Sequence, residues 1–320
     1  MEQLRAVLPS LFGPLPDSLS LNESQTQHDD DDDDDDDDEQ DGLTPCLLGS
    51  RIDDDGSHFH VNLSSPKLLQ NAMSGYGQDL VILNGTFRVT KEGFCIIVCM
   101  TVDAAHHALP ISISVTTGER KIAAIALLQD TRNALEKLKG FKWEPQYGLS
   151  DHSEAFIAAF QDFGCTRCAD CFFHVTRTLS RKAKGLGQST YDTIKKDVQI
   201  IATVLTDEAF NLVMKECFDK WSSMGVDEKF LKAWKKQYYN AHWNCRSLPP
   251  GFPTTTAAIE GLNWTIKASW LKRTQKKLIS VLPVLKEMLQ NWSWRKTKPV
   301  TALYPNRRQL NALKIQLSRT

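Results

Sequence analysis

Three apolar, β-branched runs follow one another closely and constrain the fold of this 320-residue chain more than any other feature. They cover residues 79–90, 94–102 and 109–116. Such runs predict strands, and the Lys91-Glu92-Gly93 segment between the first two predicts a hairpin turn. We therefore expect the folded part of the chain to begin near Asp79 with three consecutive antiparallel strands.

Helix and strand signals alternate after the third run. Residues 119–139 place apolar side chains near a helical repeat that Gly140 ends. Residues 146–149 predict a short strand, residues 153–163 a helix, and residues 168–173 another strand before a basic helix. This β-β-β-α-β-α-β-α order predicts an α/β protein with a ribonuclease H-like fold, in which helices cover a mixed five-stranded sheet.

The pattern changes again in the second half of the chain. Strand signals disappear over residues 187–246, where aromatic residues punctuate amphipathic helical stretches, and the proline-rich segment 249–253 ends them. Helical patterns return at residues 254–270 and 278–294.

These patterns divide the chain into three parts. We expect a mostly disordered acidic region over residues 1–75. A ribonuclease H-like domain is expected over residues 76–275, with an all-α insertion at about 187–250. A basic helical tail is expected over residues 276–320.

Charge is distributed very unevenly along the chain, although the formal net charge is only −1. Residues 1–80 hold 3 Lys and Arg against 19 Asp and Glu, whereas residues 81–320 hold 35 against 20. Residues 29–38 are ten consecutive aspartates, and such a run repels itself and is expected to be disordered. Three interpretations of it stay open: a solubilising spacer, a site for a basic partner such as a histone-like protein, and docking onto the chain's own basic surface.

Composition excludes or disfavours several classes of protein. Hydrophobic residues make up 41% of the chain, with 14 Phe and 8 Trp, which excludes a wholly disordered or fibrous protein. No apolar run is long enough for a transmembrane helix, so no membrane association is expected. Glu2 and the nearby prolines are untypical of a signal peptide. We therefore expect an intracellular, nuclear protein whose 8 Cys are reduced thiols.

Three polar residues stand where a polynucleotidyl transferase of the predicted fold carries its chemistry. Such enzymes need three carboxylates around two divalent cations, one from the first strand, one from the end of the fourth strand and one from a late helix. Asp151 follows the predicted fourth strand, and Glu260 lies in the helix predicted at residues 254–270. Asn84 interrupts the apolar first strand, where asparagine is disfavoured.

Four short blocks carry a resemblance to a transposase family. They are Asn84-Gly85-Thr86-Phe87, Asp151 followed by Ala155-Phe156, Cys171-Phe172-Phe173-His174, and Glu260 after a threonine-rich approach. In this order and spacing, over about residues 76–275, the sequence resembles the MULE (Mutator-like) transposase domain, a DDE family. The resemblance implies metal-dependent DNA cleavage and strand transfer, with Asp151 and Glu260 as ligands of Mg²⁺ or Mn²⁺.

The chain departs from this family at the first acidic position, where Asn84 replaces an aspartate. An amide can lend an oxygen to a metal but carries no negative charge, so the charge of two dications would be poorly compensated. Asp79 is expected on the opposite strand face, and Asp103 at the far end of the neighbouring strand. The resulting Asn-Asp-Glu triad predicts that cleavage and strand transfer are lost or severely reduced.

Simpler interpretations of the same residues stay open. Asp151 could cap the helix that follows it, Glu260 could be a solvated helix residue, and Asn84 could be a buried amide with hydrogen-bond partners.

The cysteines before His174 raise the question of zinc. The run Cys165, Cys168, Cys171 and His174 has enough ligands in number, but it lacks the distant second pair with which structural zinc sites close a loop. Zinc is therefore disfavoured, and we expect Cys171 and His174 to pack and hydrogen-bond beside the active centre.

The carboxyl-terminal part of the chain is strongly basic. From Gly261 onward it holds 13 Lys and Arg and a single acid, Glu287, with aromatic residues interleaved. Such a surface predicts sequence-independent, salt-sensitive binding of double-stranded DNA, although a solvated basic face is the simpler alternative. The predicted DNA-binding residues are Lys267, Lys272, Arg273, Lys276 and Lys277.

Three functional hypotheses follow from these patterns. The favoured one is a transposase-derived DNA-binding domain that is catalytically defective. The alternatives are a domesticated, non-enzymatic chromatin or nucleic-acid-binding protein, and an active nuclease that tolerates Asn84. Transposases usually act as multimers, so a homo-oligomer is considered, although no dimer-forming pattern is recognisable.

Overall fold

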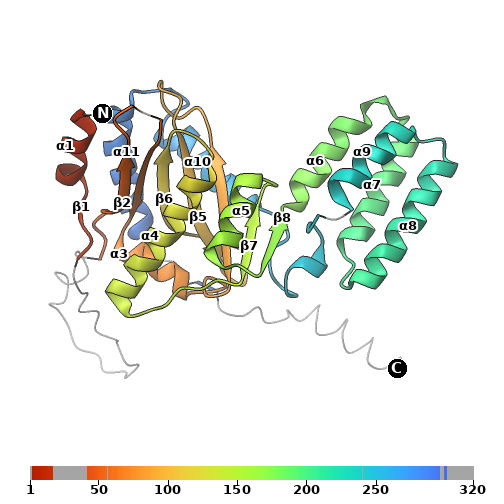
Figure 1. The fold of residues 1–320 in the computed structure, drawn as a ribbon, viewed down its shortest axis with the longest axis horizontal. Coiled ribbons are helices and arrows are strands. Elements are labelled where there is room, and N and C mark those ends of the chain that lie inside the picture. Colours follow the sequence, from red (N-terminus) through yellow and green to blue (C-terminus); the bar gives the residue numbers. More distant parts are fainter. Residues whose placement is uncertain (1, 17–41, 56, 240, 296–298, 301–320) are drawn as a thin grey trace.

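One mixed sheet forms the centre of the protein (Figure 1). The computed structural model describes residues 2–16, 42–55, 57–239, 241–295 and 299–300. Within these residues the sheet has eight strands in the order β1-β2-β3-β6-β5-β4-β7-β8. The strands are β1 (Gly13–Pro14), β2 (Cys46–Ile52), β3 (Phe59–Ser64), β4 (Leu80–Thr86), β5 (Cys95–Val102), β6 (Ala108–Thr116), β7 (Tyr147–Ser150) and β8 (Arg167–Asp170).

The five strands from β4 to β8 agree with the order that the sequence predicts. β4 pairs antiparallel with β5, and β5 pairs antiparallel with β6. On its other edge β4 pairs parallel with β7, which pairs parallel with β8. The predicted α/β class is therefore confirmed, and the carboxyl ends of three parallel strands meet at one edge of the sheet.

The sheet is wider than the sequence predicted, because β2 and β3 extend it beyond β6. The expectation of a mostly disordered region over residues 1–75 is wrong for these strands and for α1 (Glu2–Leu11), although the aspartate run at residues 29–38 lies outside the described residues. All six residues of β3 are buried. Its polar face is buried too, and there Asn62 Nδ2 donates a hydrogen bond at 2.7 Å to Asp130 Oδ2 of α4 (Lys121–Lys139).

Helices cover both faces of the sheet. α4 and α5 pack on one face, whereas α1, α10 and α11 pack on the other. Beyond α1, the α-helices are α3 (Pro66–Leu69), α4 (Lys121–Lys139), α5 (Glu154–Phe163), α6 (Phe172–Lys182), α7 (Gln188–Ala202), α8 (Asp207–Ser223), α9 (Glu228–Tyr238), α10 (Ala257–Thr265) and α11 (Leu278–Ser293). A π-helical turn, Ile266–Trp270, continues α10.

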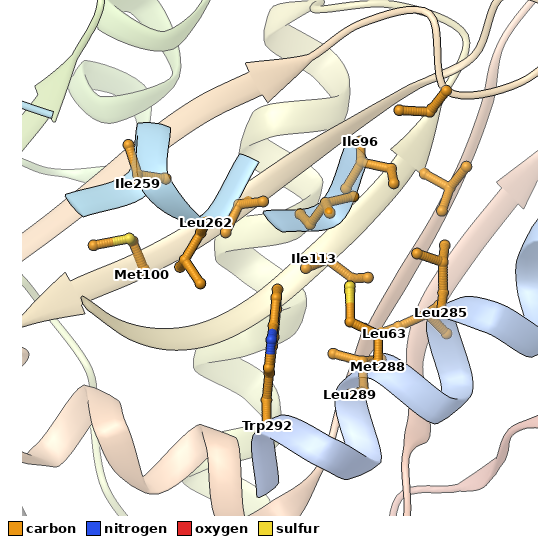
Figure 2. Close-up of a cluster of buried hydrophobic side chains, with 14 of the residues drawn as sticks. Leu63, Ile96, Met100, Ile113, Ile259, Leu262, Leu285, Met288, Leu289 and Trp292 are labelled. Carbon is orange, nitrogen blue, oxygen red and sulfur yellow. The ribbon is translucent and has the colours of Figure 1, made fainter. Parts of the chain in front are cut away.

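The apolar residues of α10 and α11 bury one face of the sheet (Figure 2). Figure 2 shows Met288 and Trp292 of α11 facing the strands, and Ile259 and Leu262 of α10 beside Met100 of β5. All five side chains belong to one buried cluster. Since Ile259 and Leu262 anchor α10 on the sheet, the position of Glu260 between them is fixed by packing.

The predicted helical stretch at residues 187–246 is confirmed as helical by α7, α8 and α9. Figure 1 shows these helices grouped together beyond the β8 edge of the sheet. They enclose their own aromatic cluster around the fully buried Trp221 and Trp234. Asp197 of α7 accepts a hydrogen bond from Trp221 Nε1 at 2.8 Å and pairs with Lys220 at 2.9 Å, which holds α7 to α8.

Among the described residues, no helix combines the length and the apolar composition that crossing a membrane requires.

Stability should depend on the contact between α11 and the sheet. Leu285 is fully buried, so we expect Leu285→Ala to lower the free energy of unfolding by about 2–5 kcal/mol. Ile279→Ala, at a partly exposed position on the same helix, is the matched control and should change it by less than about 1 kcal/mol. Urea denaturation followed by circular dichroism measures both, and equal losses would contradict this packing.

Candidate functional site

The predicted first and second site residues lie level with each other at the carboxyl ends of β4 and β7. The parallel register pairs Leu80 with Tyr147 and Ile82 with Leu149. The same offset, continued by two residues, brings Asn84 level with Asp151. Ile82 and Leu149 both belong to the cluster beneath α10 and α11, and strand alternation assigns Asn84 to that same face.

Asn84 is buried without a hydrogen-bond partner. It is 5% exposed, and its side chain forms no hydrogen bond with any described residue. The interpretation of Asn84 as a buried amide with partners is therefore wrong for the part of the chain that the structure describes, and the amide remains available to a ligand.

Asp151 is partly buried directly after β7. Its Oδ1 atom is inaccessible to solvent and has no hydrogen-bond partner. Burial raises the pKa of this carboxyl, while the nearby positive charge of His174 acts in the opposite direction. The helix that follows is capped by the side chain of Ser153, which accepts a hydrogen bond from the Phe156 amide. Asp151 is thus not the cap of α5, and its unpaired oxygen is free to bind a cation.

Cys171 holds the start of α6 against the start of α10. Its Sγ atom accepts hydrogen bonds from the amide and the hydroxyl of Thr256, at 3.1 and 3.0 Å. Burial by itself raises the pKa of the thiol, but the contacts with His174 and Thr256 outweigh burial and lower the pKa below its usual value. Thiolate character at Cys171 is therefore favoured by its surroundings.

His174 links Cys171 with both predicted acidic residues. Its contact with Cys171 raises the imidazole pKa, and the negative charges of Asp151 and Glu260 act in the same direction. The distance from His174 Nδ1 to Glu260 Oε1 is 3.7 Å. The Thr256 hydroxyl also lies 3.3 Å from Glu260 Oε1. These contacts join the ends of β7 and β8 to α10.

Three of these side chains form a group that could hold a metal ion. One ligand atom each from Cys171, His174 and Glu260 lies within 4.8 Å of the other two. No other such group of histidine, cysteine and acidic residues occurs among the described residues. Asp151 is not a member of the group, although its charge acts on His174. The two predicted metal ligands, Asp151 and Glu260, are thus connected through His174.

The other cysteines of the Cys-x-x-Cys run do not join this group. Cys165 is buried in the core beneath α4 and α5, and Cys168 packs against the same core. Burial raises their pKa values to about 12 and about 11, respectively. Cys165 and Cys168 therefore belong to the hydrophobic core, whereas Cys171 and His174 belong to the polar site.

The predicted DNA-binding residues follow α10 along one border of the sheet. Lys267 lies in the π-helical turn, and Lys277 caps α11. Lys272 and Arg273 adopt left-handed backbone angles, with φ of 50° and 55°. The Lys276 carbonyl accepts a hydrogen bond from the Lys91 amide at 2.9 Å, which ties this segment to the β4–β5 connection. The candidate cationic residues are thus brought close to the end of β4.

Two residues beside the site escaped sequence reasoning. Thr256 bonds to a cysteine 85 positions earlier, and no local pattern indicates such a contact. Glu119 is partly buried next to β4, and its carboxylate occupies the space that a side chain on Gly85 would need. Burial raises the pKa of Glu119, and the negative charge of Asp151 adds to this increase. Gly85, next to Asn84, was the available signal for this close approach.

Comparison with known proteins gives no independent identification: no protein-family model matches the chain, and no curated protein matches it.

The coupling between Cys171 and His174 can be measured directly. Replacing Cys171 with alanine removes the main cause of the raised imidazole pKa, so the His174 pKa should fall. Cys217→Ala, which alters a buried cysteine among the insertion helices, should leave it unchanged. NMR titration of the His174 ring resonances measures both variants. Equal His174 titration curves in the wild type and Cys171→Ala would contradict the described contact.

Proposed function

We propose that this chain is a transposase-derived DNA-binding protein, descended from a MULE transposase with a ribonuclease H-like domain, in which metal-dependent cleavage and strand transfer are lost or severely reduced. Support comes from the strand order β6-β5-β4-β7-β8, with three antiparallel strands followed by two parallel ones. Along the chain, these strands and the helices α4, α5 and α6 follow the predicted β-β-β-α-β-α-β-α order. Without a matching family or relative, the proposal rests on the residues themselves.

One observation carries the proposal: the register of β4 and β7 brings Asn84 level with Asp151 on the sheet face that α10 covers. α10 carries Glu260 and packs against β4. Residues 84, 151 and 260 are far apart in the chain, yet all three belong to β4 or to segments that pair or pack with it. Strand, strand end and late helix are the three sources of ligands that the resemblance implies.

The donor atoms of the site fit a hard divalent cation only in part. Asp151 Oδ1 is buried and without a partner, as expected of an oxygen that awaits a cation, and the Asn84 amide likewise lacks a partner. Mg²⁺ and Mn²⁺ prefer such oxygen ligands. When bound, these ions would activate an attacking water or hydroxyl and stabilise the leaving oxygen.

Two features of the site weaken cation binding. Asn84 contributes no negative charge, so the dications would be short of one carboxylate. His174, whose pKa is raised mainly by Cys171 and further by the charges of Asp151 and Glu260, would in its protonated form compete with a cation for these two acids. Both effects favour a protein that binds DNA without cutting it.

Restoring the missing carboxylate tests the proposal. We expect Asn84→Asp to raise the rate of Mg²⁺- or Mn²⁺-dependent nicking of supercoiled DNA by at least about tenfold over wild type, equivalent to about 1.4 kcal/mol of transition-state stabilisation. The double variant Asn84→Asp/Asp151→Ala is the control and should return nicking to background.

Two outcomes would overturn the proposal. A folded Asn84→Asp protein that gains no nicking would contradict the ancestral catalytic role and favour the non-enzymatic alternative. Absence of salt-dependent DNA binding by the wild-type chain would contradict the DNA-binding role itself.

A further inference from the structure

Two large aromatic side chains are exposed on either side of the candidate site. Phe173 is 45% exposed and Trp264 is 61% exposed. Phe173 precedes His174, and the two ring centroids lie 5.7 Å apart. Trp264 lies one helical turn after Glu260, and residues four apart share a helix face. Because His174 Nδ1 is 3.7 Å from Glu260 Oε1, both aromatic residues flank the same contact.

Each aromatic residue is followed by a cation without an ionic partner. Arg177 lies one turn after Phe173 on α6, and Lys267 lies three residues after Trp264. Both are exposed, and neither forms an ion pair with a described residue. After β4, an exposed aromatic residue and an exposed cation, Phe87 and Arg88, are adjacent in the chain. Exposed aromatic residues and cations thus occur together on three segments: after β4, in α6, and at α10 with its π-helical turn.

The chain at Arg88 meets the segment that follows Lys267, where Gln275 Nε2 donates a hydrogen bond to the Arg88 carbonyl at 3.5 Å. The positive charge of Arg88 helps to lower the pKa of Lys267, although partial burial is the larger cause. Arg88 also adopts a left-handed backbone conformation, with φ of 60°. Like charges that act on each other are stabilised when an anion binds beside them. A nucleic-acid phosphate supplies such an anion.

The aromatic rings point to the form of nucleic acid. In a duplex the base faces are already stacked on each other, so a duplex needs the cations of this surface but not its exposed rings. Unpaired bases present their faces and stack on aromatic side chains whatever their sequence. Exposed rings accompanied by cations are therefore suited to a single strand.

We propose that Phe173 and Trp264 form a stacking platform for unpaired bases, so that the site takes single-stranded DNA in preference to duplex, while Arg88, Arg177 and Lys267 contact its phosphates. The choice of DNA as the nucleic acid rests on the proposed function. The stacking platform itself rests on the exposure and placement of the two rings.

Binding by the full-length chain to labelled DNA tests this proposal. Fluorescence anisotropy would compare a short oligothymidylate with a duplex of equal length, and the wild type should bind the single strand more tightly. Trp264→Ala and Phe173→Ala should each weaken single-strand binding by about 5- to 100-fold and duplex binding by less than about twofold. Lys267→Gln should lower the salt dependence of single-strand binding. The slope of the logarithm of the binding constant against the logarithm of the salt concentration should be smaller in magnitude by about 0.7.

Trp294→Ala is the matched control. Trp294 is also exposed, but it ends α11, where the adjacent Ser293 hydroxyl hydrogen-bonds with that of Ser65 before α3. This variant should leave both affinities unchanged. Equal or tighter duplex binding by the wild type, or equal affinities of Trp264→Ala and Trp294→Ala for the single strand, would overturn the platform. If neither the single strand nor the duplex binds the wild-type chain, both the stacking platform and the proposed DNA-binding function are contradicted.

Discussion

The parallel pairing of β4 with β7 is the constraint on which the candidate site depends. A slip of one residue would turn Asn84 to the other face of the sheet, away from α10. Two kinds of packing fix the register. Ile82 and Leu149 are buried together beneath α10 and α11. On the opposite face, Phe160 of α5 fills the space beside Gly148 that any larger residue would need. Backbone pairing and core packing thus specify the same alignment.

A second constraint joins the sheet to α10 through Cys171 and Thr256. The Cys171 sulfur accepts two hydrogen bonds from Thr256, directly before α10 begins. Glu260 lies one turn later and is held by the packing of Ile259 on the sheet. The cysteine therefore positions the helix that carries the third predicted site residue, and it brings His174 between the two acids. The Cys-x-x-His block is thus a structural link as well as part of a candidate metal-binding group.

Sequence patterns predicted the parts of the fold that local chemistry determines. The β-branched runs gave the strands from β4 to β6, and Gly140 marked the end of α4, where it adopts a left-handed conformation. β3 was missed although Phe59, Val61 and Leu63 alternate with polar residues as in a strand, because the surrounding segment is rich in Gly, Ser, Pro and Asp. The roles of Thr256 and of the Arg88–Lys267 pair depend on contacts between distant segments, which no local pattern encodes.

We propose that Asn84 and Asp151 share one cation site that lacks a carboxylate. Titration with Mn²⁺, followed by electron paramagnetic resonance, tests this shared site without any need for turnover. We expect Asn84→Asp to tighten Mn²⁺ binding by at least about tenfold, since one carboxylate is restored, and the addition of Asp151→Ala to remove this gain. Unchanged Mn²⁺ affinity in a folded Asn84→Asp protein would contradict the claim.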